Sequence, residues 1–168
     1  MSQLKQAAAE FLAQRRIAVA GATRAPGSTA NAIAKRLRAE GYEVFPVNPN
    51  ADEVEGERCY RSLAAIPGGV DGVLVVTHPD VAPEVVRECA ALGIPRVWLH
   101  RGPSQGSYSA EAVAECERAG IAVIDGACPL MFLAHADGGH RFLCWMLGLI
   151  GKLPDGSRYQ GARLLPRA

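Results

Sequence analysis

The stretch that decides the fold is IAVAGATRAPGST, residues 17–29. It begins as a short apolar run that closes on Gly21, which is typical of a buried β-strand. Ser28 then stands where an N-cap would start a helix, and we expect that helix to continue to about Glu40 and to end at Gly41. A strand, a glycine-rich turn and a helix in this order open a βαβ unit.

Strands and helices alternate along the rest of the chain. Four more apolar runs have the length of strands, at residues 42–48, 71–77, 96–100 and 121–124. Helical patterns lie between them, at residues 80–92 and 109–119, and each is followed by a glycine. This alternation predicts an α/β fold, a three-layer Rossmann-like domain with a mainly parallel five-stranded sheet.

The predicted domain covers residues 1–152. It includes a helix at the N-terminus over residues 2–14 and another helix at about residues 141–150. Residues 153–168 are polar and interrupted by glycine and proline, so we expect a loosely held tail.

Composition limits the partners of this domain. The chain has 168 residues, of which 49% are hydrophobic and 21% charged, so it can bury a core. Lys+Arg 18 against Asp+Glu 17 gives a net charge of +1, which favours neither nucleic acid nor a membrane as a partner. The 5 cysteines are odd in number and form no CxxC, and the N-terminus lacks a signal-peptide pattern. We therefore expect reduced thiols and a cytoplasmic location.

The loops that follow the strands carry the candidate site, because ligands of open parallel sheets bind beyond the carboxyl ends of the strands. In the first loop, residues 21–29, Gly21 and Gly27 permit close approach of the backbone. The N–H groups of the helix start at Ser28 and the guanidinium of Arg24 favour an anion such as a phosphate. The alternative is an ordinary glycine-rich turn.

Two nucleotide-binding motifs are excluded by the spacing of this loop. It matches neither G-x-G-x-x-G nor G-x-x-x-x-G-K-[ST]. An NAD site also places Asp or Glu after the second strand, to bind the ribose hydroxyls, whereas this chain has Val47-Asn48-Pro49-Asn50 there. The sequence favours a ligand that carries a phosphate on its adenosine ribose.

Six motifs together resemble a known family. They are GATRAPGST, VFPVNP, EGERCYRSLAAIP, VDGVLVVTHP, VWLHRG and AGIAVIDGACPLM, in that order between about residues 10 and 132. The chain resembles the small single-domain coenzyme A-binding proteins, whose fold is similar to the CoA-binding Rossmann domain of the succinyl-CoA synthetase α-subunit. The resemblance implies coenzyme A, or an acyl-CoA, as the ligand.

The resemblance also assigns parts of coenzyme A to the strand-end loops. It implies that the phosphates contact Thr23, Arg24 and the turn Gly27, Ser28 and Thr29. Asn48 and its loop would face the adenosine, and Thr77, His78 and Pro79 would line the adenine or diphosphate side. His100 and Arg101 would border the pantetheine arm. The chain departs from the family at three places. The second-strand loop has no lysine before Arg58, His100 stands where these proteins commonly carry glutamine, and His78 also differs from the residues expected at its position.

No catalytic constellation is predicted. His78 and His100 have no Ser or Cys partner at the spacing of a nucleophile elbow, and the synthetase's phosphohistidine segment is missing. We therefore expect a binding or regulatory protein rather than an enzyme. The alternatives are an NAD(P)-dependent oxidoreductase and a nucleotide-sensing interaction subunit, and the sequence leaves a homo-oligomer open.

The remaining thiols and histidines have structural interpretations. Cys128, His135, His140 and Cys144 lack the usual spacing of a zinc site and lie among packing residues, so no metal is predicted. Cys128 could also form a mixed disulfide with the CoA sulfur, but a buried structural thiol is favoured. Cys89, Cys116, Trp98 and Trp145 are predicted to lie in the core.

Overall fold

The computed structural model describes residues 3–101 and 106–133, which contain a five-stranded sheet. Its strands are β1 (Arg16–Ala20), β2 (Glu43–Val47), β5 (Gly72–Val75), β6 (Arg96–Leu99) and β7 (Ala122–Ile124). Its helices are α1 (Gln3–Leu12), α2 (Thr29–Ala39), α3 (Ala82–Ala91) and α4 (Ala110–Ala119). The strand order is β2-β1-β5-β6-β7 and every pairing is parallel, which confirms the predicted fold class.

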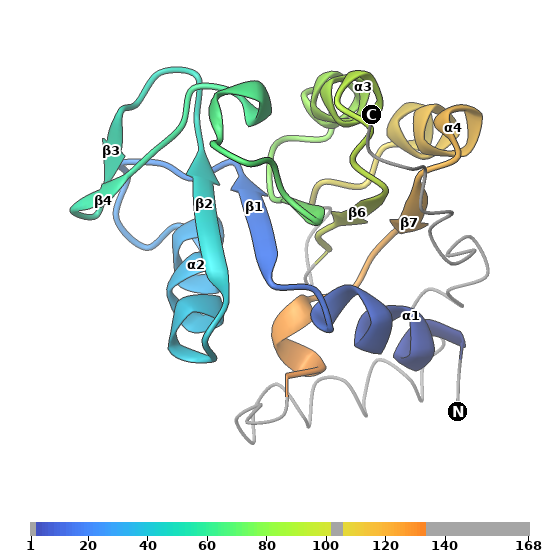
Figure 1. Cartoon of the computed structure of the whole chain (residues 1–168), viewed down its shortest axis with the longest axis horizontal. Coiled ribbons are helices and arrows are strands. Elements are labelled where there is room, and N and C mark those ends of the chain that lie inside the picture. Colours follow the sequence, from blue (N-terminus) through green and yellow to red (C-terminus); the bar gives the residue numbers. More distant parts are fainter. Residues whose placement is uncertain (1–2, 102–105, 134–168) are drawn as a thin grey trace.

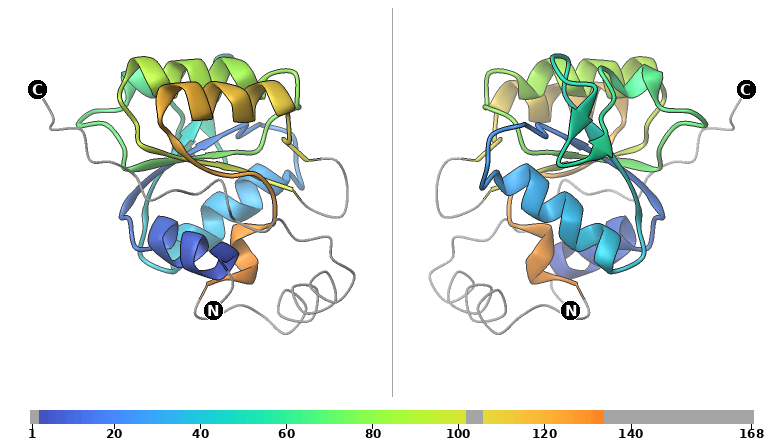
Figure 2. Two further views of the ribbon diagram at one scale, coloured as in Figure 1. Left: turned by 90° about the vertical axis from the view of Figure 1, so that its right-hand side faces the viewer. Right: turned by 90° about the vertical axis from the view of Figure 1, so that its left-hand side faces the viewer.

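The sheet is the middle of three layers (Figures 1 and 2). In Figure 2, α3 and α4 lie above the sheet and α1 and α2 lie below it. The sheet has a hydrophobic core on each face, and alternate side chains of each strand pack into one core or the other. Ala18 and Val73 belong to the core beneath α3 and α4, whereas Ile17 and Leu74 belong to the core against α1 and α2. Burial on both faces explains why these strands are almost wholly apolar.

Trp98 anchors the lower core. It is fully buried, and the Phe11 ring of α1 meets its ring edge-on, with 5.3 Å between centroids. Its indole N–H donates to the Gly126 carbonyl oxygen over 2.8 Å, so the polar atom is satisfied. Cys89 and Cys116 are fully buried in the upper core, so all three residues are the core residues that the sequence predicts.

The predicted helix signals also act as expected. Ser28 caps α2 and Ser109 caps α4, each accepting a backbone N–H three residues later. Gly120 ends α4 in a left-handed conformation, with φ 68°. The predicted strands are longer than the observed ones by a few residues at their ends.

A short hairpin after β2 is not predicted from the sequence. Its strands, β3 (Glu53–Val54) and β4 (Glu57–Arg58), pair antiparallel and lie beyond β2 in Figure 1. Two-residue strands are too short to show alternation of apolar and polar residues, which explains why the pattern is missed. Single 3₁₀ turns at Leu63–Ala65 and Pro129–Met131 complete the described elements.

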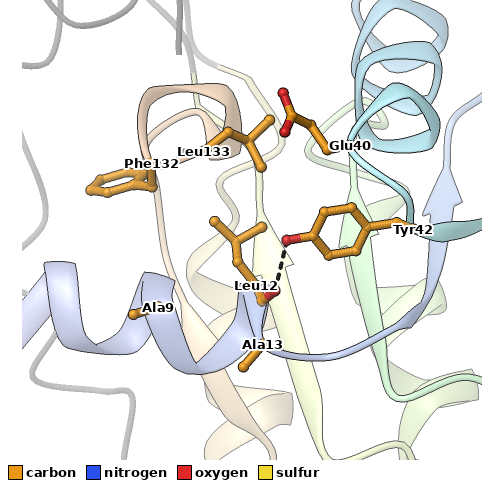
Figure 3. Close-up of a pocket in the computed structure, with 7 residues that line it drawn as sticks. All are labelled: Ala9, Leu12, Ala13, Glu40, Tyr42, Phe132 and Leu133. Atoms are coloured by element: carbon orange, nitrogen blue, oxygen red, sulfur yellow. Dashed lines mark hydrogen bonds between the residues drawn. The ribbon is translucent and has the colours of Figure 1, made fainter. Parts of the chain in front are cut away.

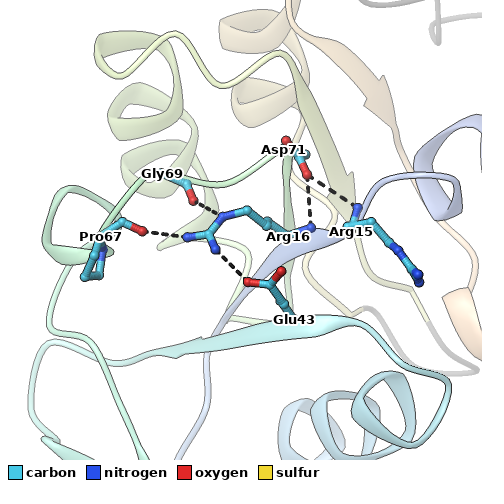
Figure 4. Close-up of polar contacts among 6 residues, drawn as sticks. All are labelled: Arg15, Arg16, Glu43, Pro67, Gly69 and Asp71. Atoms are coloured by element: carbon cyan, nitrogen blue, oxygen red, sulfur yellow. Dashed lines mark hydrogen bonds and ion pairs between the residues drawn. The ribbon is translucent and has the colours of Figure 1, made fainter.

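Arg16 joins three segments at the amino ends of the strands (Figure 4). Its guanidinium donates to the Glu43 carboxylate over 2.6 Å and to the backbone oxygens of Gly69 and Pro67. The Asp71 carboxylate accepts the backbone N–H of Arg16 over 3.0 Å. The edge of the sheet opposite the candidate site is therefore held by charge-assisted bonds from one side chain.

Several predictions lie outside the described residues. These are the helix at about residues 141–150, the tail at 153–168, and His135, His140, Cys144 and Trp145. Within residues 3–101 and 106–133, no group of His, Cys, Asp and Glu side chains could hold a metal ion. No helix of that part has the length and apolar character needed to cross a membrane.

Candidate functional site

The order of the strands reverses between β1 and β5, which places the expected ligand crevice at the carboxyl ends of these two strands. Gly21 follows β1 there, with φ +107°. A Cβ on Gly21 would lie 2.4 Å from the carbonyl oxygen of Val76, which follows β5. Only glycine therefore lets the first loop pass this close to the neighbouring strand end.

The loop between β1 and α2 is shaped by Asn31, a buried side chain in the first turn of α2. Its Oδ1 accepts the Thr23 N–H over 3.1 Å, and its Nδ2 donates to the Thr23 carbonyl oxygen over 2.7 Å. The Thr23 hydroxyl in turn accepts the Ala25 N–H over 3.2 Å. Asn31 is not predicted from the sequence, because an asparagine inside a helical pattern does not indicate which loop its side chain will contact.

Asn48 holds the second loop to the first. Its Nδ2 donates to the Ala22 carbonyl oxygen over 2.6 Å, and its Oδ1 accepts the Asn50 N–H over 2.8 Å. The guanidinium of Arg24 reaches the Asn50 carbonyl oxygen at 3.5 Å. The side chain of Asn48 is therefore hydrogen-bonded to backbone groups of the two loops. The adenosine predicted at this loop would meet the surface of the loop rather than the Asn48 side chain.

Ser107 joins the loops that follow β5 and β6. It is almost completely buried, its hydroxyl donates to the Thr77 carbonyl oxygen over 2.7 Å, and its N–H donates to the His100 carbonyl oxygen over 2.7 Å. Gly106 packs against the same place, where a Cβ would lie 2.4 Å from the His100 carbonyl oxygen. These contacts bring Thr77 and His100 together, as the prediction of one shared site requires.

His78 and Arg101 lie at the surface of these loops. The side chain of His78 is 71% exposed, and its Nδ1 lies 3.3 Å from the Asp80 carboxylate. The exposed guanidinium of Arg101 lies 5.6 Å from the centre of the Tyr108 ring. Neither side chain is packed into the core, and both residues follow the carboxyl ends of their strands.

His100 differs from His78 because it is buried. Burial lowers the pKa of His100 below its ordinary value, since removal from water disfavours the charged imidazolium. The ring is therefore neutral at pH 7, which suits a wall for an uncharged part of a ligand better than a phosphate contact.

The buried His100 predicts a loss of stability in mild acid. The unfolded chain, with an ordinary histidine pKa near 6.5, binds the proton more readily than the folded chain does. The free energy of unfolding should therefore fall as the pH drops below about 6.5 and level off below the folded-state pKa. Urea unfolding at pH 7.5 and pH 5 would measure this, and His100→Gln should show a smaller fall. An equal fall in both proteins would contradict the prediction.

Cys128 follows β7 and is also buried. Burial raises the pKa of its thiol, with a smaller opposing effect from a backbone hydrogen bond at Leu130. The protonated thiol dominates at neutral pH, and it is the thiolate that attacks disulfides. The geometry therefore favours the structural interpretation of Cys128 over a mixed disulfide.

Two hollows of the described residues lie away from the predicted site. The first, shown in Figure 3, is lined by residues around the end of α1 and the start of β2, where the Tyr42 hydroxyl donates to the Leu12 carbonyl oxygen over 2.7 Å. The second lies at the amino ends of β5, β6 and β7 and includes Asp71 and Arg96. Neither contains any residue predicted to contact coenzyme A.

The predicted contact residues gather on one edge of the sheet. All follow the carboxyl ends of β1, β2, β5 and β6: Gly21, Thr23, Arg24, Gly27, Ser28, Thr29, Asn48, Thr77, His78, Pro79, His100 and Arg101. The structure thus brings them to the edge where the topology places a ligand. It assigns structural contacts to the side chain of Asn48, and it adds Asn31 and Ser107 to the residues that shape these loops.

A strand reversal with a glycine-containing loop and a helix start beside it is typical of nucleotide-binding α/β domains. Residues 15–134 match the family model described as CoA binding domain, and the chain belongs to this family. It is 34% identical over 122 residues to uncharacterized protein YneT of Bacillus subtilis (strain 168), covering 73% of this chain and 86% of that protein.

A solved structure and a longer enzyme are also similar. The hypothetical protein from Pyrococcus horikoshii OT3 has a TM-score of 0.70 and 29% identity, covering 83% of this chain and 92% of that one. Acetate–CoA ligase (ADP-forming) II of Archaeoglobus fulgidus is 39% identical over 80 residues, which cover 46% of this chain. This chain spans only 12% of the length of that ligase.

Proposed function

We propose that this chain binds coenzyme A or an acyl-CoA along the carboxyl edge of its sheet and carries out no reaction of its own. The observation that supports this most directly is the approach of Gly21 to the Val76 carbonyl at the strand reversal, in a chain matched by the CoA binding domain model. The loop that follows Gly21 leads to the start of α2, where backbone N–H groups and the helix dipole favour a phosphate.

The proposal that the chain carries out no reaction of its own is supported by the state of the histidines and the cysteine near the carboxyl ends of the strands. His100 is buried and neutral, and Cys128 is held as a protonated thiol. His78 is exposed and lies beside Asp80, but nothing in the described part of the chain places a nucleophile next to it. Binding of the ligand, rather than transfer of its acyl group, is what these residues can provide.

The end of β2 distinguishes coenzyme A from NAD. After Val47 the chain has Asn48, whose side chain is bound to backbone groups and cannot accept both ribose hydroxyls as a carboxylate does. We expect coenzyme A to bind at least about tenfold more tightly than NAD, a difference of about 1.4 kcal/mol. Calorimetric titration with each ligand measures this ratio, and tighter or equal binding of NAD would refute the proposal. Mass spectrometry of a copurified ligand would identify it independently.

A further inference from the structure

A pocket lies at the end of the sheet opposite the candidate coenzyme A site. It has a volume of about 590 Å³ and is formed where β5, β6 and β7 begin. A volume of this size is ordinary for a small-molecule site. Its walls are mainly apolar, and their larger side chains are all aliphatic: Leu63, Ile66, Val70, Leu92, Ile94 and Ile121. We call this hollow the amino-end pocket.

Arg96, the first residue of β6, gives the amino-end pocket a buried positive charge. Its side chain is only 9% exposed. In the part of the chain that the structure describes, its Nε has no hydrogen-bond partner. Its ion-pair contact is with Glu10 of α1, whose Oε1 lies 3.8 Å from Nη2, too far for a hydrogen bond. A buried donor without an acceptor is costly, so this guanidinium is suited to an anion that enters the pocket.

Among the described residues, two other polar side chains line the amino-end pocket, and both already have partners. The Asp71 carboxylate accepts the backbone N–H of Arg16 over 3.0 Å (Figure 4). The Gln14 Nε2 donates to the Glu10 carbonyl oxygen over 3.0 Å. The guanidinium of Arg96 is therefore the group of this pocket that a charged ligand would contact.

We propose that the amino-end pocket binds an aliphatic monocarboxylate, with its carboxylate on the Arg96 guanidinium and its chain against the apolar walls. The planar fork of a guanidinium matches the two oxygens of a carboxylate, and aliphatic walls remove a hydrocarbon chain from water. A ligand with several negative charges is disfavoured, because the carboxylates of Glu10 and Asp71 lie at the same end of the sheet. This site is separate from the proposed coenzyme A site and does not depend on it.

Three variants test the two halves of this site. Arg96→Met removes the charge and keeps a long side chain, and replacing a buried ion by an apolar residue often leaves stability unchanged. Ala90→Trp narrows the pocket from an exposed position of α3, so the core is not disturbed. Glu10→Gln removes the carboxylate that competes for Arg96. Arg118→Ala, an exposed arginine of α4 paired with Glu115, is the control for loss of one positive charge.

The probe is hexanoate, and hexanamide is its uncharged match. In ¹H–¹⁵N spectra, hexanoate should shift the amide signals of the pocket residues Gly93, Ile94, Gly120 and Ile121 in a saturable way. Hexanamide should bind at least about tenfold more weakly, because it lacks the charge that pairs with Arg96. Arg96→Met and Ala90→Trp should each weaken hexanoate at least about tenfold, whereas Glu10→Gln should bind it about twofold to threefold more tightly. Arg118→Ala should stay within about twofold of the wild type.

Melting temperatures give a second measurement. Hexanoate should raise the melting temperature of the wild type but not that of Arg96→Met, because only a protein that binds the ligand is stabilised by it. A purely structural Arg96 would lower the melting temperature when replaced and would leave the response to hexanoate unchanged.

The inference would be overturned by a wild type that shows no saturable shifts, by hexanamide binding as tightly as hexanoate, or by a folded Arg96→Met that binds hexanoate like the wild type. If Arg96→Met does not fold, Ala90→Trp decides, since unchanged binding in that variant would place hexanoate outside the pocket. Titration with coenzyme A is independent of these results. A failure to bind coenzyme A would overturn the proposed function and would leave the hexanoate shifts as they are.

Discussion

Replacing Gly21 with alanine should lower the free energy of unfolding by about 3 kcal/mol or more, because two penalties act together. The residue would keep a left-handed φ of +107°, and its Cβ would meet the Val76 carbonyl oxygen at 2.4 Å. Gly21 and Val76 directly follow β1 and β5, and the Val76 N–H donates to the Ala20 carbonyl oxygen over 2.8 Å, so the clash cannot be relieved without disturbing the pairing of these strands. Urea unfolding of the variant measures the effect.

Gly41→Ala is the matched control for this prediction. Gly41 also has a left-handed φ, of +87°, but nothing lies within 4 Å of the position of its Cβ. It should lose only about 1 kcal/mol, from backbone strain alone. Equal losses in the two variants would show that the close approach at the strand reversal contributes nothing. Any Gly21→Ala protein that folds should also have lost affinity for coenzyme A.

Replacing Arg24 with alanine should weaken the binding of coenzyme A by about 1 to 3 kcal/mol, with little effect on folding. The guanidinium is exposed, and its contact with the Asn50 carbonyl oxygen is long, at 3.5 Å. It is therefore available to form charge-assisted bonds with a phosphate. Titrations at low and high salt should show a weaker salt dependence in the variant, because one screened charge is gone.

Dephospho-coenzyme A identifies the phosphate that Arg24 contacts. A loss seen with both ligands assigns Arg24 to the diphosphate, whereas a loss seen only with coenzyme A assigns it to the 3′-phosphate. The second result would supply the partner that a loop without lysine before Arg58 lacks. Arg118→Ala, an exposed arginine of α4 paired with Glu115, controls for a change of net charge. Unchanged affinity in a folded Arg24→Ala would remove Arg24 from the site.

The three-layer fold and the end of the sheet that carries the candidate site could be predicted, because short stretches of neighbouring residues indicate each strand and helix. A short apolar run that ends at a glycine, as at Gly21, is typical of a buried strand. Ser28 marks a helix start because its side chain caps the helix, and Gly93 and Gly120 mark helix ends because glycine readily adopts a left-handed conformation. The position of the candidate contact residues then follows from the parallel arrangement alone.

The contacts that shape the loops could not be predicted in this way. Asn31 acts on Thr23 through its side chain, and Glu55 reaches Asn31 from a hairpin whose strands are too short to show a pattern. Ser107 joins Thr77 to His100 only because β5 and β6 are neighbours in the sheet. Each of these contacts links segments that are distant in sequence, and spacing along one sequence contains no signal for them.

The place of β1 between β2 and β5 has a consequence for the order of events during synthesis. β1 pairs with β2 on one side and with β5 on the other. During synthesis, residue 17 can pair with residue 72 only after residue 72 has left the ribosome. Until then, one side of β1 exposes unpaired backbone groups, which favours association with other chains. The approach of Gly21 to Val76 forms only after this closure. The candidate site is therefore completed late during synthesis, and a ligand would bind only after β1 and β5 have paired.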